Sequence, residues 1–246
     1  MKPPTPSGSS SHDVRLPRYH RVRDALSAQI AARQWRPDEP IPTEAELAQA
    51  HAVSIGTVRK AVDSLVADGL LERFQGRGTF VRRPDFQSSL FRFLDAGGTA
   101  RVPVSRILKR EEAPLPAAVA AALQLAPGTP AIRFLRLRLI DDRPLLLEDI
   151  WLPRERFKAL LKIDPREFGD LLYPLYEQYC GVLVASAQET LTAEAAGARH
   201  ARLLELAAGA PVIVVERVAL SADRQPLEWR QSRGPANQFR YQAEIR

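Results

Sequence analysis

The chain has 246 residues, of which 45% are hydrophobic and 26% charged, and a formal net charge of +6. This is the composition of a globular protein long enough for two domains, and the excess charge is divided evenly between residues 1–85 and 86–246. Its apolar stretches are too short to cross a bilayer, so we expect a cytoplasmic chain with no membrane partner. A single cysteine excludes an intramolecular disulfide, and without a Cys/His cluster of zinc-site spacing we expect no metal and no cofactor.

The N-terminal part divides into a tail and a helix. Residues 1–16 are rich in proline and serine and cannot bury enough apolar surface to offset the entropy of ordering, so we expect a disordered tail. Apolar side chains then recur at helical spacing at Val22, Leu26 and Ile30, and prolines follow them. This pattern predicts a first helix near residues 18–33.

Two short helices joined by a three-residue turn come next. Thr43 predicts the start of the first, because Glu46 three residues later completes a capping box. Ser54 predicts the start of the second, which places Val58 and Val62 on one face. So short a connection prevents antiparallel packing, so the two helices must cross steeply as a helix-turn-helix.

A predicted hairpin follows the helix-turn-helix. Residues 70–74 and 79–83 read as two short strands around a Gln-Gly-Arg-Gly turn, whose glycines permit a tight reversal. In this position the hairpin is a wing. We therefore predict a winged helix-turn-helix domain over residues 17–83, a polar linker over residues 84–90, and a second domain over residues 91–246.

The second domain contains an internal repeat with an offset of 81 residues. Residues 123–143 and 204–224 share ten identities in 21 aligned positions. Each copy has a short helix, a Gly-Pro turn, a strand, an Asp-Arg turn and a second strand. The repeat predicts two related halves, each a helix followed by a hairpin.

Further elements complete the predicted sheet. Residues 101–108 and 181–192 read as additional strands, and residues 153–161 and 170–179 as crossing helices. The second domain is therefore expected to be α+β, a mainly antiparallel sheet with helices on one face.

The helix-turn-helix and wing predict a surface that binds duplex DNA. The N-terminal part of the second helix enters the major groove, where exposed polar side chains meet bases and phosphates. Helix N-termini direct free amides at phosphate oxygens, and the wing tip follows the minor groove. The alternative is a winged helix that docks onto protein. The candidate DNA-contacting residues are Thr43, Glu44, Ser54, Thr57, Arg59, Lys60, Gln75, Gly76, Arg77 and Gly78.

Motifs in both domains resemble the GntR family of transcription regulators, and residues 86–246 resemble the UTRA effector domain of its HutC subfamily. The motifs are Pro42-Thr-Glu-Ala-Glu-Leu-Ala48, Val53-Ser-Ile-Gly-Thr-Val-Arg59, Asp68-Gly-Leu-Leu-Glu-Arg-Phe-Gln-Gly-Arg77, Arg136-Leu-Arg138, Pro144-Leu-Leu-Leu-Glu148, Leu172-Tyr-Pro-Leu-Tyr176 and Pro226-Leu-Glu-Trp229. The resemblance implies a homodimer that binds a palindromic DNA operator, usually as a repressor released by a small molecule. It also implies a second domain with a fold similar to chorismate lyase, for effector binding and dimerisation.

Three positions depart from that family pattern. Ala45 and Ile55 stand where the family usually has arginines, and Ala52 where it has glycine. A bidentate arginine–guanine pair contributes about 1–3 kcal/mol of discrimination, so we expect an altered or weaker operator reading in which Arg59 has a larger share. Ala52 is expected to adopt a left-handed turn at a cost of roughly 1 kcal/mol relative to glycine.

Two arginines are the leading candidates for the effector site. Arg136 and Arg138 are two residues apart on a predicted strand, so both point from the same face. Paired guanidinium groups suit a carboxylate or a phosphate, although arginines on a solvated strand would give the same pattern. Arg136 has a counterpart, Arg217, in the second repeat, which allows a structural role. Arg138 aligns with Ala219 and is therefore the stronger ligand candidate.

The resemblance adds Glu148, Tyr173 and Glu228 as residues that line the effector cup. It also implies that a phosphate-binding serine and a late arginine of the family are replaced by Leu171 and Pro235. This weakens the case for a phosphosugar, and a carboxylate or another small metabolite is at least as well supported, so we expect an organic acid, an amino-acid derivative or a sugar derivative.

These patterns predict a sequence-specific DNA-binding regulator, a repressor whose operator affinity is controlled by a small metabolite. Two alternatives stay open. A chorismate-lyase-like enzyme domain fused to a DNA-binding head rests on fold analogy alone, since no nucleophile with an adjacent base is visible. A constitutive DNA binder without effector is the other. We expect no enzymatic activity.

Overall fold

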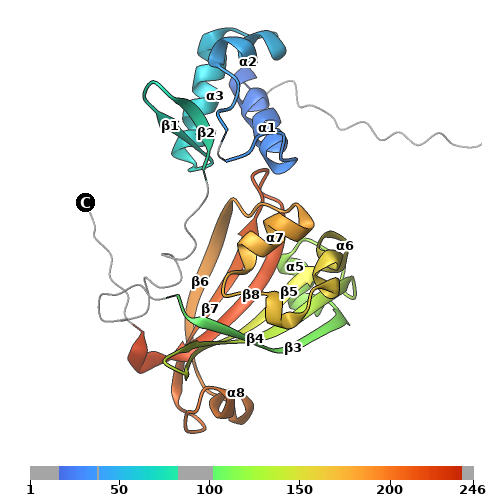
Figure 1. Ribbon diagram of the computed structural model, residues 1–246, viewed down its shortest axis with the longest axis vertical. Helices are drawn as coiled ribbons and strands as arrows, with labels where there is room; N and C mark the ends of the chain where they lie inside the picture. The colour runs from blue at the N-terminus through green and yellow to red at the C-terminus, as the bar shows by residue number, and fades with distance from the viewer. Residues whose placement is uncertain (1–16, 38, 83–101, 240–246) are drawn as a thin grey trace, which may run out of the picture.

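The computed structural model describes residues 17–37, 39–82 and 102–239. The predicted tail at residues 1–16 and the predicted linker at residues 84–90 lie outside these ranges. The described residues form a small head of helices with a hairpin, and a larger domain built on one sheet (Figure 1). No helix in these ranges is long and apolar enough to span a membrane.

The head has the predicted helix-turn-helix and wing. Its core is formed by apolar side chains that recur on one face of each helix, among them Leu26, Leu47, Val58 and Val62, each less than 5% exposed. The elements are α1 (Arg18–Ala31), α2 (Glu44–Ala50), α3 (Ile55–Ala67), β1 (Leu71–Phe74) and β2 (Gly78–Val81).

Side-chain caps begin both helices of the motif, as predicted. Thr43 Oγ1 accepts a hydrogen bond from the Glu46 amide at 3.3 Å, and the Glu46 carboxylate accepts one from the Thr43 amide at 2.7 Å. Ser54 Oγ accepts from the Thr57 amide at 3.2 Å. These bonds satisfy amides that have no partner within the helix, so the turn between α2 and α3 has a fixed geometry.

Ala52 lies in that turn with φ 51°, the left-handed conformation expected from the sequence. Glycine adopts this conformation without a Cβ penalty, so Ala52→Gly is expected to stabilise the head by about 1 kcal/mol. Ala25→Gly, inside α1, is the matched control and should destabilise the head by about 1 kcal/mol. Urea unfolding followed by circular dichroism measures the free energy of unfolding of both variants. A change of the same sign in both would show that Ala52 is not strained by its left-handed conformation.

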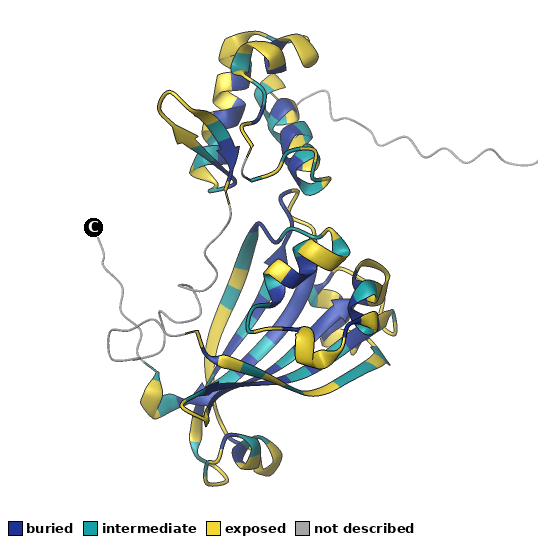
Figure 2. Cartoon of the chain, in the orientation of Figure 1, coloured by how far each residue is buried: buried dark blue, intermediate teal, exposed yellow. Residues whose placement is uncertain are grey.

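The larger domain is built on an antiparallel sheet with the order β3-β4-β5-β8-β7-β6. The inner strands are buried and the outer strands β3 and β6 are largely exposed (Figure 2). The strands are β3 (Val104–Pro114), β4 (Pro130–Ile140), β5 (Arg143–Pro153), β6 (Ser186–Ala195), β7 (Pro211–Leu220) and β8 (Pro226–Pro235). The helices are α5 (Ala117–Ala122), α6 (Arg154–Phe157), α7 (Leu172–Cys180) and α8 (Ala198–Leu203), with 3-10 turns η1 (Lys158–Lys162), η2 (Pro165–Glu167) and η3 (Ala236–Gln238).

The sheet confirms the internal repeat as two halves related by an approximate two-fold axis. Strands β3, β4 and β5 run from one edge to the centre, and β6, β7 and β8 run from the other edge to the centre. The left-handed residues Gln124 (φ 56°) and Glu205 (φ 56°) occupy the same position in each half. The two halves meet where β5 pairs with β8, which brings Glu148 opposite Ser232.

Helices cover both faces of this sheet, which corrects the expectation of helices on one face. Alternate residues of a strand point to opposite faces. Ile132 and Phe134 of β4 pack with α6 and α7, whereas Ala131 packs with α5 and Leu137 with α8. The short repeat helices therefore cover the second face, and α7 covers the first.

Candidate DNA-binding surface and effector site

The N-terminal turn of α3 presents the predicted DNA-contacting side chains. Ser54, Thr57, Arg59 and Lys60 lie on the outer side of the helix, and the Arg59 side chain is 62% exposed. Ile55, at one of the positions that lacks the family arginine, is 48% exposed on the same turn. This surface therefore combines hydrogen-bonding groups with one apolar side chain.

The wing tip holds Arg77 in a defined position. Its guanidinium carbon lies 5.5 Å from the centre of the Phe74 ring and 5.9 Å from that of Phe80. Gly76 and Gly78 have φ of 73° and 113°, which other residues rarely adopt, so the turn depends on glycine at both positions. Gln75 is exposed beside them. The stacked guanidinium is thus presented at the end of the hairpin.

Glu44 lies between two arginines of the DNA-binding surface. Arg59 Nε donates to one of its carboxylate oxygens at 2.9 Å, and Arg73 Nη2 donates to the other at 3.1 Å. Arg73 also donates to Asp63 of α3 at 2.5 Å. These contacts hold the Arg59 and Arg73 side chains against α2, and a contact of Glu44 with DNA stays a prediction. Sequence reasoning missed Arg73, because the pairing of β1 with α2 depends on tertiary structure.

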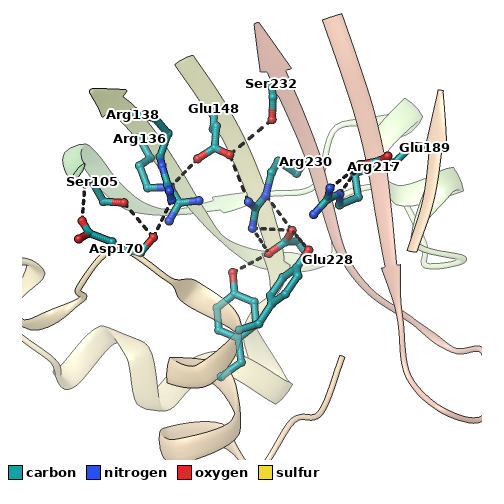
Figure 3. Close-up of polar contacts among 12 residues, drawn as sticks. Ser105, Arg136, Arg138, Glu148, Asp170, Glu189, Arg217, Glu228, Arg230 and Ser232 are labelled. Atoms are coloured by element: carbon teal, nitrogen blue, oxygen red, sulfur yellow. Dashed lines mark hydrogen bonds and ion pairs between the residues drawn. The ribbon is translucent and has the colours of Figure 1, made fainter. Parts of the chain in front are cut away.

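The face of the sheet beneath α7 contains a buried cluster of charged groups (Figure 3). Arg136 Nε donates to Glu148 Oε2 at 2.5 Å, and Arg230 Nη1 donates to Glu148 Oε1 at 3.2 Å. Burial alone would raise the pKa of the Glu148 carboxyl, but the positive charges of Arg136 and Arg230 outweigh it and hold this pKa well below 4.5. Glu148 is therefore a fixed negative charge.

Glu228 is the second buried carboxylate of the cluster. Arg230 donates to both of its oxygens at 2.9 Å, Tyr176 donates its hydroxyl at 2.6 Å and Tyr173 at 3.3 Å. Burial and the charge of Glu228 raise the pKa of both tyrosines above their ordinary value. The tyrosines thus remain protonated donors, and they attach α7 to the centre of the sheet.

Arg138 differs from the other arginines of the cluster. It is 5% exposed, and its Nη1 donates to the backbone carbonyl of Asp170 at 2.6 Å. Within the described residues no ion pair joins it to a carboxylate. Burial, and then the charge of Arg136, lower the pKa of Arg138 to about 10, so it stays positive at neutral pH. Nearby, Arg136 Nη1 is buried without a hydrogen-bond partner.

Comparison with known families identifies both domains. The family described as bacterial regulatory proteins, gntR family, matches residues 18–81, and the UTRA domain matches residues 99–240, more than half of the chain. The chain belongs to the GntR family. Its UTRA domain fits the HutC subfamily, as the sequence motifs indicate.

Relatives of this GntR-family chain are transcriptional repressors. The HTH-type transcriptional repressor NagR of Bacillus subtilis is 30% identical over 82% of this chain and 84% of its own length. The histidine utilization repressor of Klebsiella aerogenes is 31% identical over 82% and 83%. The ligand-binding domain of a GntR-family regulator from Bordetella bronchiseptica covers 62% of this chain and 94% of its own, with a TM-score of 0.55 and 29% identity. The chain is thus a DNA-binding transcriptional repressor with a metabolite-responsive UTRA domain.

The structure brings the five predicted effector residues of the UTRA domain to one face of the sheet. Arg136, Arg138, Glu148 and Glu228 lie on the sheet (Figure 3), and Tyr173 of α7 donates to Glu228 from above it. Burial of both arginines shows that the solvated-strand interpretation is wrong. Arg217, the counterpart of Arg136, donates its Nε to Glu189 at 2.8 Å, so each half of the repeat has an arginine–glutamate pair.

Sequence reasoning missed Arg230, which joins Glu148 to Glu228. Arg230 lies 82 residues after Glu148, at its counterpart position in the second half of the sheet. Extending the repeat through the second strand of each half would have paired these two positions. Glu148 and Arg230 carry opposite charges at counterpart positions of the repeat, and this sequence signal could have identified Arg230.

Proposed function

We propose that this GntR-family repressor binds a palindromic operator as a homodimer in the cytoplasm, and that an anionic metabolite bound by Arg138 changes its operator affinity. The proposed ligand group is a carboxylate. The single observation on which this rests is the buried guanidinium of Arg138, which meets a backbone carbonyl rather than a carboxylate. The palindrome and the homodimer are supported by the family resemblance.

The charges of the cluster support an anionic ligand. Arg136, Arg217 and Arg230 each face a glutamate, whereas Arg138 lies beside the like charge of Arg136. The charges of Glu148 and Asp170 attract Arg138 without forming an ion pair with it, and a ligand carboxylate would supply a direct partner through two parallel hydrogen bonds. Arg136 Nη1 offers a further donor. The Klebsiella relative is named for the utilization of histidine, which is itself a carboxylate.

The same geometry favours binding over catalysis. Glu148 is held ionised by two guanidinium groups, and a carboxylate with so low a pKa is a weak base. Tyr173 and Tyr176 donate to Glu228 with raised pKa values, so neither supplies a nucleophile at neutral pH. A lyase-like activity therefore has no acid–base pair to support it among these residues, and we propose that the UTRA domain has no enzymatic role.

Thermal-shift measurements with matched ligand pairs test the effector proposal. Each pair holds a carboxylate and a neutral analogue, such as histidine with histidinol and succinate with succinamide, and glucose 6-phosphate with glucose tests the phosphate. We expect one carboxylate to raise the melting temperature by about 5 °C at saturating concentration, and its neutral analogue to leave it unchanged. Equal shifts with both members would contradict an anionic ligand, and no shift across a broad panel would favour the constitutive binder.

Arg59→Ala tests the DNA-binding surface. We expect it to lose about 1–3 kcal/mol of binding to the operator that wild type selects from random-sequence DNA, with relaxed preference at one base pair. Lys60→Ala, the neighbouring control, should weaken selected and random DNA alike and reduce the salt slope by about 1. Fluorescence anisotropy at several salt concentrations measures both. Unchanged affinity of Arg59→Ala at physiological salt would show that α3 is not the reading helix.

A further inference from the structure

The head of the chain contacts its UTRA domain directly, at the C-terminal end of α1. Arg33 Nη2 donates to Glu177 Oε1 at 2.8 Å, and Arg33 Nη1 donates to the Glu177 backbone carbonyl at 2.8 Å. The two side chains are 31% and 19% exposed. Ala185 and Ala222 of the UTRA domain are buried in the same apolar cluster as the core of the head, with Leu183 beside them. Figure 1 shows the end of α1 directed toward α7.

This contact is limited in extent. A pocket of about 470 Å³ lies beside this contact, between α1 and the UTRA domain, and is lined by Arg23 and Ser27 of α1 and by Ser186, Ala222 and Arg224 of the UTRA domain. The two domains therefore do not pack together along the whole of α1. Their orientation depends on a few apolar side chains and on the bidentate contact of Arg33 with Glu177.

Arg33 has a conformation that its contact explains. It follows the helix end at Ala32 with φ 58°, in the left-handed region where glycine is usual. A side chain in this conformation is strained, and such strain persists when the surroundings hold the residue in place. The left-handed backbone carries the arginine off the end of α1, and its guanidinium reaches α7. A glycine would end α1 with less strain but could not make this contact.

The partner helix α7 is also the helix attached to the effector cluster. Tyr173 and Tyr176 donate to Glu228 within the sheet, and Glu177 follows them immediately. At the other end, Asp170 lies two residues before α7, and its carbonyl accepts from Arg138. A ligand carboxylate that engages Arg138 competes with this carbonyl. Asp170 is also attached to β3, because its carboxylate accepts from the Ser105 amide at 2.7 Å and its carbonyl accepts from the Ser105 hydroxyl at 3.2 Å. Loss of the Arg138 bond weakens this attachment, which would alter the position of α7 and, through Glu177, that of Arg33.

We propose that Arg33 and Glu177 are positioning residues that form a latch between the domains, coupling occupancy of the Arg138 site to the orientation of the DNA-binding head through α7. This inference rests on the proposed function, since it takes Arg138 as the ligand-binding residue. The latch needs no contact between the ligand and the head. The proposed latch also explains why an arginine, and not a glycine, stands at the left-handed position after α1: ending the helix requires no side chain there, whereas the contact with Glu177 does.

Hydrogen exchange of the full-length protein, without ligand and without DNA, tests the latch. Arg33→Gly removes the guanidinium and relieves the backbone strain, and Glu177→Gln keeps the shape and removes the charge. In both variants we expect amide exchange in residues 26–33 and 181–185 to rise about fivefold, the factor for one hydrogen-bonded ion pair. Gln124→Gly is the control, because it relieves the same left-handed strain far from the latch, and it should leave both segments unchanged.

A double-mutant cycle separates coupling from a local structural role. Arg138→Met removes one of the two hydrogen bonds to the Asp170 carbonyl and leaves the one from Ser105. We expect it to change exchange in α1 when Arg33 is present and to have no such effect in the Arg33→Gly background. An equal effect of Arg138→Met in both backgrounds, or unchanged exchange in both latch variants, would overturn the proposal. Either outcome leaves the thermal-shift test of the effector site intact, so the two proposals can fail separately.

Discussion

Glu148→Gln is expected to lower the free energy of unfolding of the UTRA domain by about 3–5 kcal/mol. The carboxylate meets Arg136 and Arg230, and all three side chains are at most 3% exposed. Removing one partner of a buried pair leaves the other charge without compensation, and Arg136 has no second carboxylate in the described structure. Urea unfolding followed by tryptophan fluorescence measures the loss, since Trp151 and Trp229 lie in this domain.

Glu194→Gln is the matched control. Glu194 also pairs with an arginine, Arg233, but its side chain is 41% exposed, so the change should cost less than about 1 kcal/mol.

The stability that Glu148 contributes should fall as the pH is lowered. Its folded-state pKa is lowered, so its contribution is present above the ordinary value of 4.5 and is lost as the pH falls below it. If Glu148→Gln lowered the free energy of unfolding by less than about 1 kcal/mol at pH 7, the ion pairs of Glu148 with Arg136 and Arg230 would not stabilise the domain.

The repeat explains why the fold of the UTRA domain could be predicted. Two copies of a helix and a hairpin must each bury one face of two strands, and joining them at β5 and β8 buries both. The glycines and left-handed residues that end the helices, such as Gln124 and Glu205, have the same conformation in each copy. The pattern did not show that α5 and α8 cover the second face. The inner strands carry large apolar residues on both faces, so their hydrophobic pattern does not distinguish a face that packs against α7 from one that packs against α8.

The site was predicted less completely, because its members are joined by strand register. Arg136 and Arg138 were visible as neighbours on one strand, but Arg230 meets Glu148 only because β8 lies beside β5. Glu44 was predicted to contact DNA, and its pairing with Arg59 became visible only when α2 and α3 were placed together. Local sequence thus indicates which charged residues belong to the two sites, whereas their ion-pair partners depend on the tertiary fold.

Arg138→Met is the variant that separates binding from stability. Methionine has a similar length and no charge, so it removes the cost of burying a guanidinium that faces another arginine. We expect the unliganded protein to gain about 1 kcal/mol in free energy of unfolding, although the bond to the Asp170 carbonyl is lost. A residue whose removal stabilises the fold is retained for its function, as buried groups in binding sites often are.

Ligand binding should respond in the opposite direction. Two charge-assisted hydrogen bonds contribute about 3 kcal/mol, so Arg138→Met should weaken binding of the active carboxylate on the order of 100-fold in isothermal titration calorimetry. Arg133→Met is the control, since Arg133 lies on the same strand but pairs with Asp149 on the opposite face. This variant should bind the carboxylate with the affinity of wild type. A destabilised Arg138→Met variant that still binds the carboxylate would assign Arg138 to the structural cluster with Arg136. A stabilised variant that fails to bind would identify Arg138 as the residue that recognises the effector.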